Sequence, residues 1–377
     1  MQVLIYEGLN YHSECLSSYY AYFKELGYEI DIVMGENRSK EKPFWMIKEL
    51  NLYTLKNLAS TNSSLLNAHI NELKEKIPNL FKYDVYFIST LIPSTYAFIK
   101  FLLRNGIKRS QILFQSHRNY KTFLHFTKND SALATNGFTL SIASEKFPQL
   151  PPIKNCTKLE HPLLNKNLDT LNIFIGGLSH IHFKNFEALV KAAEELNRIG
   201  KVIKIKVTGI REQKDYILPK SDCVEYLGRL NFEEMAQQYI VNDYCFVLFD
   251  EKALEHMIDH RVFLRGRISG SRNMSIMYKI PLVVQEPYQK AWGLDDTNSI
   301  AYSGHDYKTI LLNLFNIDKE YYNKIIKNLQ IKEKEEFELG ITNLKNKLSF
   351  IKTLPALSYT QKSSSSKLRK IDKYVKF

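Results

Sequence analysis

Short apolar runs alternate with helical patterns along the chain. This alternation limits the possible folds more than any other feature of the sequence. The runs MQVLIYE at 1–7 and YEIDIVM at 28–34 are typical of strands buried on both faces of a parallel sheet. A helical pattern at 13–26 separates them. Strands that alternate with helices predict a parallel sheet covered by helices on both sides. The other elements expected in this series are strands at 84–90, 111–116 and 137–143 and a helix at 95–103, with 45–78 helical or irregular.

A stretch dense in Pro and Asn at 147–168 interrupts the series and indicates a domain boundary. A second series follows, and 377 residues are more than one core usually organises. We therefore expect an α/β protein with two Rossmann-like domains at 1–160 and 161–350, and a basic tail at 351–377. The second series predicts strands at 171–177, 201–209, 223–228, 244–250, 280–285 and 298–304, and helices at 185–199, 232–240, 272–279 and within 305–350.

Charge and composition limit the class of partner. The formal net charge is +12, which favours an anionic partner such as a nucleotide phosphate or an anionic lipid. The four cysteines have no metal-ligand spacing, which indicates reduced thiols and no zinc site. MQVLIYEG is typical of a first strand, not of a secretory signal, and no apolar run approaches the roughly 20 residues of a membrane span. We expect a cytoplasmic protein.

Glycines and a lysine in the second half form the first candidate site. The strand LNIFIGG ends in Gly176 and Gly177, and Lys184 and Asn185 open the next helix. Glycines let a backbone pass close to a ligand, and a helix N-terminus carries free N–H groups and partial positive charge. This combination suits a diphosphate, although a plain tight turn also explains it. Gly209, at the end of the next strand, joins this candidate set.

Two further segments of the second half suit a nucleotide. In CVEYLGRL, a turn at Gly228 leaves backbone groups available to a base, and Arg229 offers stacking or a charge; an ordinary turn with a surface Arg is the alternative. In RISGSRNMS, small residues precede a short helix that Ser271 can cap, and Arg265, Arg267 and Arg272 surround it. The candidate phosphate-binding residues of this segment are Ser269, Gly270, Ser271, Arg272, Asn273 and Ser275.

These segments together resemble a known family. The order G-G-x6-K-N, Y-L-G-R-L and a short helix running into K-I-P-L-V-V resembles the C-terminal domain of GT-B glycosyltransferases over 171–302. The likeness is greatest to the bacterial lipopolysaccharide and capsule sugar transferases of the group 1, family 4-like type. It implies two Rossmann-like domains facing across a cleft. It also implies that Gly177, Lys184, Gly228, Arg229 and 269–275 bind the donor, a nucleotide sugar that is a substrate and not a cofactor.

The chain departs from that family pattern at three positions. Retaining members commonly carry two glutamates with seven residues between them, and the matching positions here are Gly266 and Met274. Glu251 and Asp259 lie upstream of them. The family's Arg after the glycines is Leu178. Inverting and retaining mechanisms therefore both stay open.

The first half offers candidates for acceptor binding and catalysis. Tyr11 and His12 follow the first strand, before a helix that Ser13 can cap, and His117 and Arg118 follow the strand at 111–116. Ligands of such sheets bind beyond the carboxyl ends of strands. We therefore expect His12 or His117 to act as the base on an acceptor hydroxyl, and Tyr11 and Arg118 to bind the acceptor. Glu7 and Glu14 are secondary candidates.

The expected function is transfer of a sugar to a cell-surface glycan or glycolipid. No DxD motif is present, so we expect no metal. The basic residues of the tail favour peripheral binding to the inner face of the cytoplasmic membrane. The alternative is a disordered, solvated tail. The alternatives are an epimerase of the same architecture and a non-catalytic two-domain sugar or nucleotide binder. The sequence has no RNP, zinc or helix-turn-helix pattern, so nucleic acid is not expected.

Overall fold

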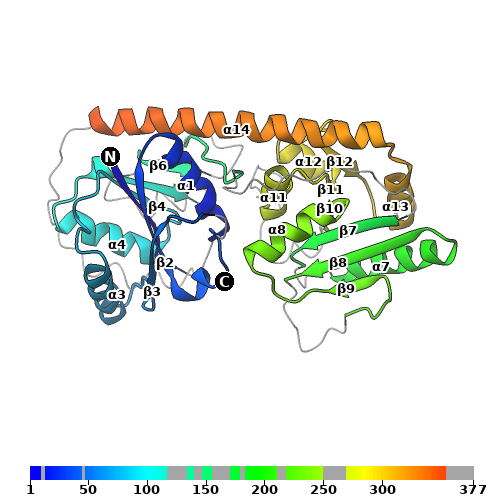
Figure 1. Cartoon of the computed structure of the whole chain (residues 1–377), viewed down its shortest axis with the longest axis horizontal. Coiled ribbons are helices and arrows are strands. Elements are labelled where there is room, and N and C mark those ends of the chain that lie inside the picture. Colours follow the sequence, from blue (N-terminus) through cyan, green and yellow to red (C-terminus); the bar gives the residue numbers. More distant parts are fainter. Residues whose placement is uncertain are drawn as a thin grey trace.

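Two α/β halves, each built on a six-stranded parallel sheet, make up the chain (Figure 1). The predicted α/β class with two Rossmann-like domains is confirmed. The computed structural model describes residues 1–9, 13–44, 47–116, 133, 135–139, 147–154, 170–178, 183–209, 218–248 and 269–353. The predicted boundary at 160 and nearly all of the predicted tail lie outside the described residues.

The first sheet has the strand order β3-β2-β1-β4-β5-β6. Val3, in the central strand, pairs with Ile30 on one side and with Val85 on the other, and every pairing is parallel. The winding reverses between β1 and β4, which makes their carboxyl ends the switch point where ligands of such sheets bind. The strands are β1 (Gln2–Glu7), β2 (Glu29–Gly35), β3 (Asn51–Leu55), β4 (Val85–Ile88), β5 (Ile112–Ser116) and β6 (Gly137–Thr139).

The second sheet repeats this order as β9-β8-β7-β10-β11-β12. Its switch point therefore lies between β7 and β10, which pair through Ile173 and Tyr244. The repeat explains why the sequence shows two similar series of strands and helices. The strands are β7 (Thr170–Gly176), β8 (Val202–Thr208), β9 (Val224–Tyr226), β10 (Tyr244–Phe246), β11 (Leu282–Gln285) and β12 (Ser299–Tyr302).

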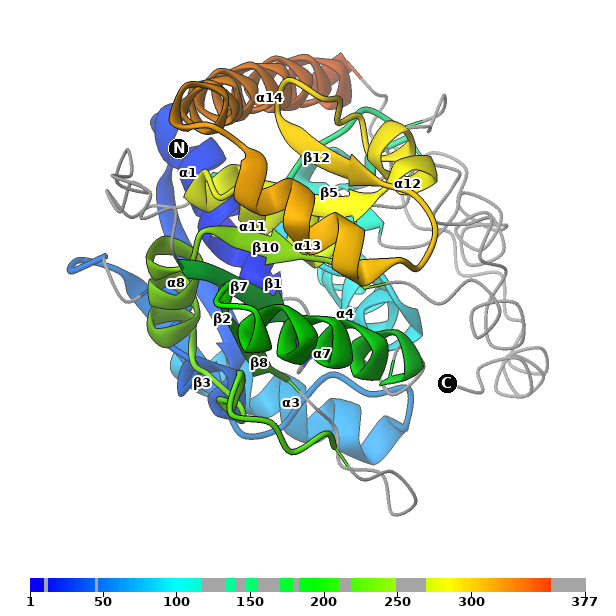
Figure 2. The ribbon, with the colours of Figure 1, turned by 90° about the vertical axis from the view of Figure 1, so that its right-hand side faces the viewer.

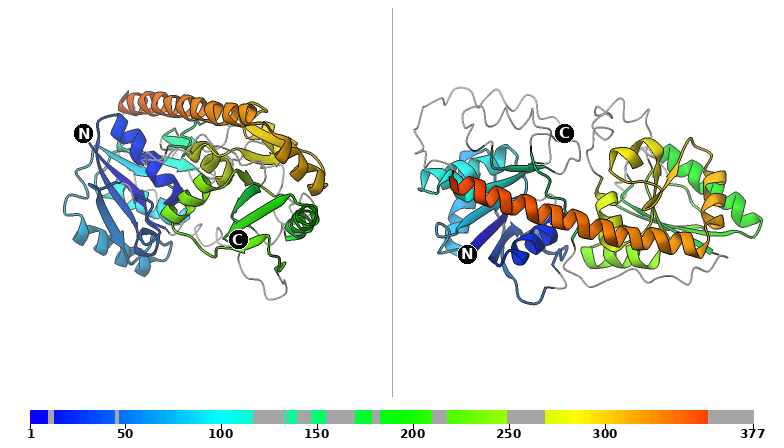
Figure 3. Two further views of the ribbon diagram at one scale, coloured as in Figure 1. Left: turned by 45° about the vertical axis from the view of Figure 1, so that its right-hand side comes forward. Right: turned by 90° about the horizontal axis from the view of Figure 1, so that it is seen from above.

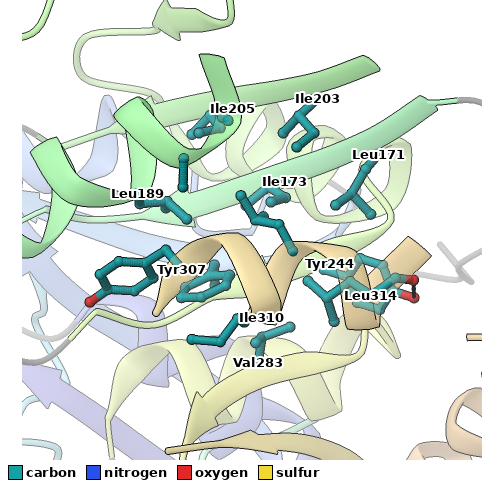
Figure 4. Packing of buried hydrophobic residues seen from close by; sticks show 14 of the residues in the cluster. Leu171, Ile173, Leu189, Ile203, Ile205, Tyr244, Val283, Tyr307, Ile310 and Leu314 are labelled. Carbon is teal, nitrogen blue, oxygen red and sulfur yellow. Dashed lines mark hydrogen bonds between the residues drawn. The ribbon is translucent and has the colours of Figure 1, made fainter. Parts of the chain in front are cut away.

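Helices cover both faces of each sheet, as the buried strands require. In the first half, α3 and α4 pack on one face, and α1 with the end of α14 on the other. In the second half, α7 and α13 cover one face (Figure 2), and α8, α11, α12 and the start of α14 cover the other. Figure 4 shows Tyr307, Ile310 and Leu314 of α13 packed beside Ile173 and Val283 of the sheet. The helices are η1 (Ser13–Cys15), α1 (Leu16–Glu25), α2 (Glu36–Ser39), α3 (Ser63–Lys76), α4 (Pro93–Arg104), η2 (Arg109–Gln111), α7 (Phe183–Arg198), α8 (Phe232–Val241), α11 (Gly270–Tyr278), α12 (Glu286–Ala291), α13 (Tyr307–Asn316) and α14 (Lys319–Thr353).

Helix α14 connects the two halves. It is 35 residues long, about 52 Å at the rise of an α-helix, and it crosses both halves (Figures 1 and 3). Leu329 packs in the core of the second half, and Leu344 in the core of the first. Between them, an added Cβ at Gly340 would collide with the ring of Tyr22, so this crossing requires a glycine. None of the helices described here has the length and apolarity that crossing a bilayer requires.

Several sequence predictions about local structure are wrong. The segment 45–78 contains the edge strand β3, whose half-exposed residues give a weak apolar pattern. Ser269, not Ser271, caps α11: its Oγ accepts a hydrogen bond from the Ser271 N–H at 3.2 Å. Ser13 does not cap α1, because a turn of 3-10 helix precedes α1 and the Ser13 hydroxyl donates instead to Glu41.

Candidate active site

The carboxyl edges of the two sheets face each other. Residues just beyond β2 in the first half contact residues just beyond β9 in the second. The Glu41 carbonyl accepts a hydrogen bond from the Phe232 N–H at 2.9 Å, and the Glu41 carboxylate binds the guanidinium of Arg229. Because ligands of both sheets bind at these edges, the space between them is the candidate active site.

Three glycines that the sequence assigned to donor binding come together at this edge of the second sheet. Gly177, Gly209 and Gly228 have φ of 110°, 71° and 64°, a conformation that favours glycine. The Gly209 N–H donates to the Gly228 carbonyl at 3.0 Å, and a Cβ on Gly209 would lie 3.2 Å from the Cα of Gly177. An added Cβ on Gly177 or Gly228 would meet no atom within 4 Å. The carboxyl ends of β7, β8 and β9 thus each present a glycine backbone, and we call these three glycines the glycine edge.

The start of α11 lies beside the glycine edge, at the switch point. An added Cβ on Gly176, the last residue of β7, would collide with the hydroxyl of Tyr239. The side chain of Ser271 lies close to that hydroxyl. Burial raises the pKa of Tyr239 well above its usual range, so the hydroxyl remains neutral. Tyr239 thereby joins the end of β7 to the first turn of α11, where Gly270 is exposed.

The remaining residues of the 269–275 segment make internal bonds. Arg272 has a side chain only 1% exposed, and its guanidinium forms two hydrogen bonds with the Glu336 carboxylate of α14. Asn273 accepts from Arg272 at 3.3 Å. Ser275 donates to the Ile280 carbonyl at 2.6 Å and so stabilises the end of α11. A role of these three residues in donor binding stays a prediction, and each already has a structural partner.

Helix α7 carries the other residues predicted to bind phosphate. Lys184 is exposed in its first turn, and Asn185 beside it is mostly buried. The four residues that join Leu178 to this helix, 179–182, lie outside the described part of the chain. A lysine in the first turn adds a full positive charge to the helix N-terminus.

A pocket of about 600 Å³ lies between the two halves, within the range of small-molecule sites. One wall follows β2 and the other follows β9. Of its residues, the sequence analysis selected only Arg229. The segment GENRSKEK after β2 was missed, although charged residues directly after a buried strand were the signal. The lining residues are Asn37, Arg38, Lys40, Glu41, Arg229, Leu230, Asn231 and Glu234.

A buried carboxylate occupies the switch point of the first sheet. Glu7 ends β1, is fully buried, and accepts hydrogen bonds from the hydroxyls of Ser89 and Thr90, which follow β4. From its pattern alone, Glu7 was only a secondary candidate. Tyr11, His12, His117 and Arg118 lie outside the described residues, as do Glu251, Asp259, Arg265 and Arg267. Within the described residues, no group of three or more His, Cys, Asp or Glu could hold a metal ion.

Comparisons with known proteins show which fold this arrangement belongs to. The chain is similar to an α-glucosyltransferase in complex with UDP and a 13-mer DNA containing an HMU base, with 14% identity, a TM-score of 0.54, and coverage of 94% of this chain and 100% of that one. It is also similar to Anabaena HepE in complex with UDP and glucose, with 13% identity, a TM-score of 0.50 and the same coverage. The chain has the GT-B fold.

A third similar structure supports the same assignment. It is a mutant of TarM from S. aureus in complex with fondaparinux, α-GlcNAc-glycerol and UDP, with 10% identity, a TM-score of 0.53, and coverage of 92% of this chain and 99% of that one. The sequence matches no family model and no curated protein. At these identities the likeness shows the fold, and the GT-B arrangement implied by the sequence is confirmed.

Proposed function

We propose that the chain is a glycosyltransferase that uses a UDP-sugar as donor. The observation that carries this proposal is the glycine edge beside the start of α11, at the switch point of a GT-B second half. The backbone of these glycines allows close approach of a nucleotide, and the first turn of α11 offers N–H groups to a diphosphate. The UDP bound in the three similar structures supports the choice of nucleotide.

In this proposal, the second half stabilises the leaving group. When the bond between the sugar and the diphosphate breaks, negative charge develops on the diphosphate. The N-termini of α7 and α11 and the ammonium group of Lys184 stabilise that charge. No cation is needed for this step, so activity should survive EDTA. Complete loss of activity in EDTA, restored by Mg²⁺ or Mn²⁺, would contradict metal independence.

The first half holds the acceptor in this proposal. Tyr11 and Arg118 bind it, and His12 or His117 takes the proton from its attacking hydroxyl if the reaction inverts the sugar. The acceptor is a cell-surface glycan or glycolipid of the lipopolysaccharide or capsule type in a bacterium. The enzyme works at the inner face of the cytoplasmic membrane, and the net charge of +12 supports binding to an anionic surface.

The test is incubation of the full chain with a panel of nucleotide sugars, with and without lipid-linked saccharides as acceptors. Release of UDP together with a glycosylated acceptor supports the transferase. Conversion of the donor sugar to its epimer without transfer identifies an epimerase, and an unchanged donor that nevertheless binds identifies a binding protein. Either of these two results contradicts the proposal.

A further inference from the structure

Glu41 of the first half contacts the second half beside the pocket. It follows the short helix α2, and its carboxylate is only 14% exposed. Arg38 of the same half donates to both of its oxygens, at 2.7 and 2.8 Å. Arg229 of the other half binds the same carboxylate. One carboxylate thus contacts guanidinium groups from both halves, next to the Gly228 turn of the glycine edge.

The backbone of Glu41 adds a second connection. Phe232 is the first residue of α8, and its N–H is one of the donors that a helix start leaves without an intrahelical partner. The Glu41 carbonyl accepts from this N–H at 2.9 Å. The side chain of Asn231 caps the same helix start by accepting from the Glu234 N–H at 3.0 Å. The first half therefore completes the cap of a helix that belongs to the second half.

The next residue, Lys42, has a strained backbone. Its φ is 52°, in the left-handed region that residues other than glycine seldom adopt. Its ammonium group lies 3.3 Å from the Glu233 carboxylate of α8. Strained residues persist where surrounding contacts fix them and are frequent at ligand clamps. Here the strain directly follows the carbonyl and carboxylate that contact the second half.

We infer that Glu41 is a positioning residue for the donor. By binding Arg229 and the first N–H of α8, it fixes the 228–232 turn across the cleft, and this turn forms the pocket wall next to the glycine edge. In this role Glu41 acts through Arg229 and α8. The inference rests on the proposed function only in so far as the ligand positioned by this wall is UDP.

The first test measures the separation of the halves without any nucleotide. Small-angle scattering of the full chain should give a larger radius of gyration for Glu41→Ala than for the wild type. Glu36→Gln, in the short helix α2 that precedes Glu41, is the control for a lost charge and should leave the radius of gyration unchanged. A wild-type radius in Glu41→Ala overturns the inference.

The second test measures UDP binding by calorimetry. Glu41→Gln should raise the Kd for UDP by about tenfold, as expected for loss of a charged hydrogen bond, with an unchanged melting temperature. In a transferase assay it should raise the KM for the donor more than it lowers kcat. A wild-type Kd in Glu41→Gln overturns the inference. If the wild type itself binds no UDP, the proposed function fails, and the scattering test still decides the role of Glu41.

Discussion

Lys184 stands exposed in the first turn of α7, where its charge adds to the partial charge of the helix start. If it binds a diphosphate, Lys184→Ala should weaken UDP binding by about 1.5–3 kcal/mol, as for a charged hydrogen bond. Lys191 lies about two turns further along the same helix. Its side chain is 69% exposed, and it provides the matched control. Calorimetry should show a lower affinity for Lys184→Ala and an unchanged one for Lys191→Ala. Equal affinities in both variants and the wild type would remove Lys184 from the phosphate site.

His69 makes stability depend on pH. It is buried, and its ring nitrogens contact the Tyr6 hydroxyl at 2.5 Å and the Asn57 carbonyl at 2.8 Å. Burial lowers its pKa below the usual value. The unfolded chain, with a His pKa of about 6.5, therefore takes up the proton more readily than the folded one. The His69 contribution is fully present above about pH 6.5 and is lost as the pH falls below it, by at most about 1.4 kcal/mol per pH unit.

Urea unfolding at pH 7.5 and pH 5.5 checks this expectation. His69→Gln should reduce the difference in stability between the two pH values. The exposed His305 serves as control, and His305→Gln should leave the difference as in the wild type. A difference that does not change in His69→Gln would mean that other groups cause the pH dependence.

At the scale of the element, α14 fixes the position of α11. Glu336 of α14 binds Arg272 of α11, and one turn earlier Glu333 binds Lys279 at 2.6 Å and Lys154 at 3.1 Å. Lys279 is the C-cap of α11. Lys154 belongs to the segment whose Pro151 carbonyl accepts a hydrogen bond from the Tyr22 hydroxyl of α1. These ion pairs connect α11, which lies beside the glycine edge, to the first half through α14.

The Glu336 pair should therefore matter strongly for stability. Burial alone would raise the pKa of Glu336, but Arg272 and then Lys332 offset this and hold it below its usual value. Glu336→Gln leaves the charge of Arg272 buried and should cost about 3–5 kcal/mol of unfolding free energy. Glu338→Gln breaks an exposed pair with Lys334 and should cost less than about 1 kcal/mol. Similar losses in chemical denaturation for the two variants would refute the structural role of the buried pair.

Burial decides which elements could be predicted from the sequence. The central strands β1 and β7 are buried on both faces and give continuous apolar runs, so their positions were predicted within one or two residues. The glycines of the glycine edge were found because each follows a strand. The edge strand β3 and the Glu41 contact were missed, since the first is half exposed and the second depends on how two halves meet. The partner of Arg272 lies 64 residues further along the chain, which no local pattern reveals.

At the scale of the whole molecule, the chain is a pair of sheets with a pocket between residues that follow β2 and β9, and α14 crosses both halves. The predicted tail continues the sequence beyond α14. The basic residues of its last part, 361–377, are Lys362, Lys367, Arg369, Lys370, Lys373 and Lys376.

Each of these basic residues should contribute about 1 kcal/mol near an anionic surface. Deleting 361–377 should abolish co-sedimentation with anionic vesicles and leave transfer to a soluble acceptor intact. Neutral vesicles are the control. Equal sedimentation of the full and the shortened chain would contradict a tail anchor.

The central claim is that the second half holds a nucleotide sugar at the glycine edge beside α11. A structure of the chain with UDP bound tests it most directly. We predict the diphosphate within hydrogen-bond distance of the first turns of α7 or α11, and the base beside the turn at Gly228. UDP bound away from the glycine edge, or no UDP bound at concentrations that saturate a nucleotide site, would contradict the account.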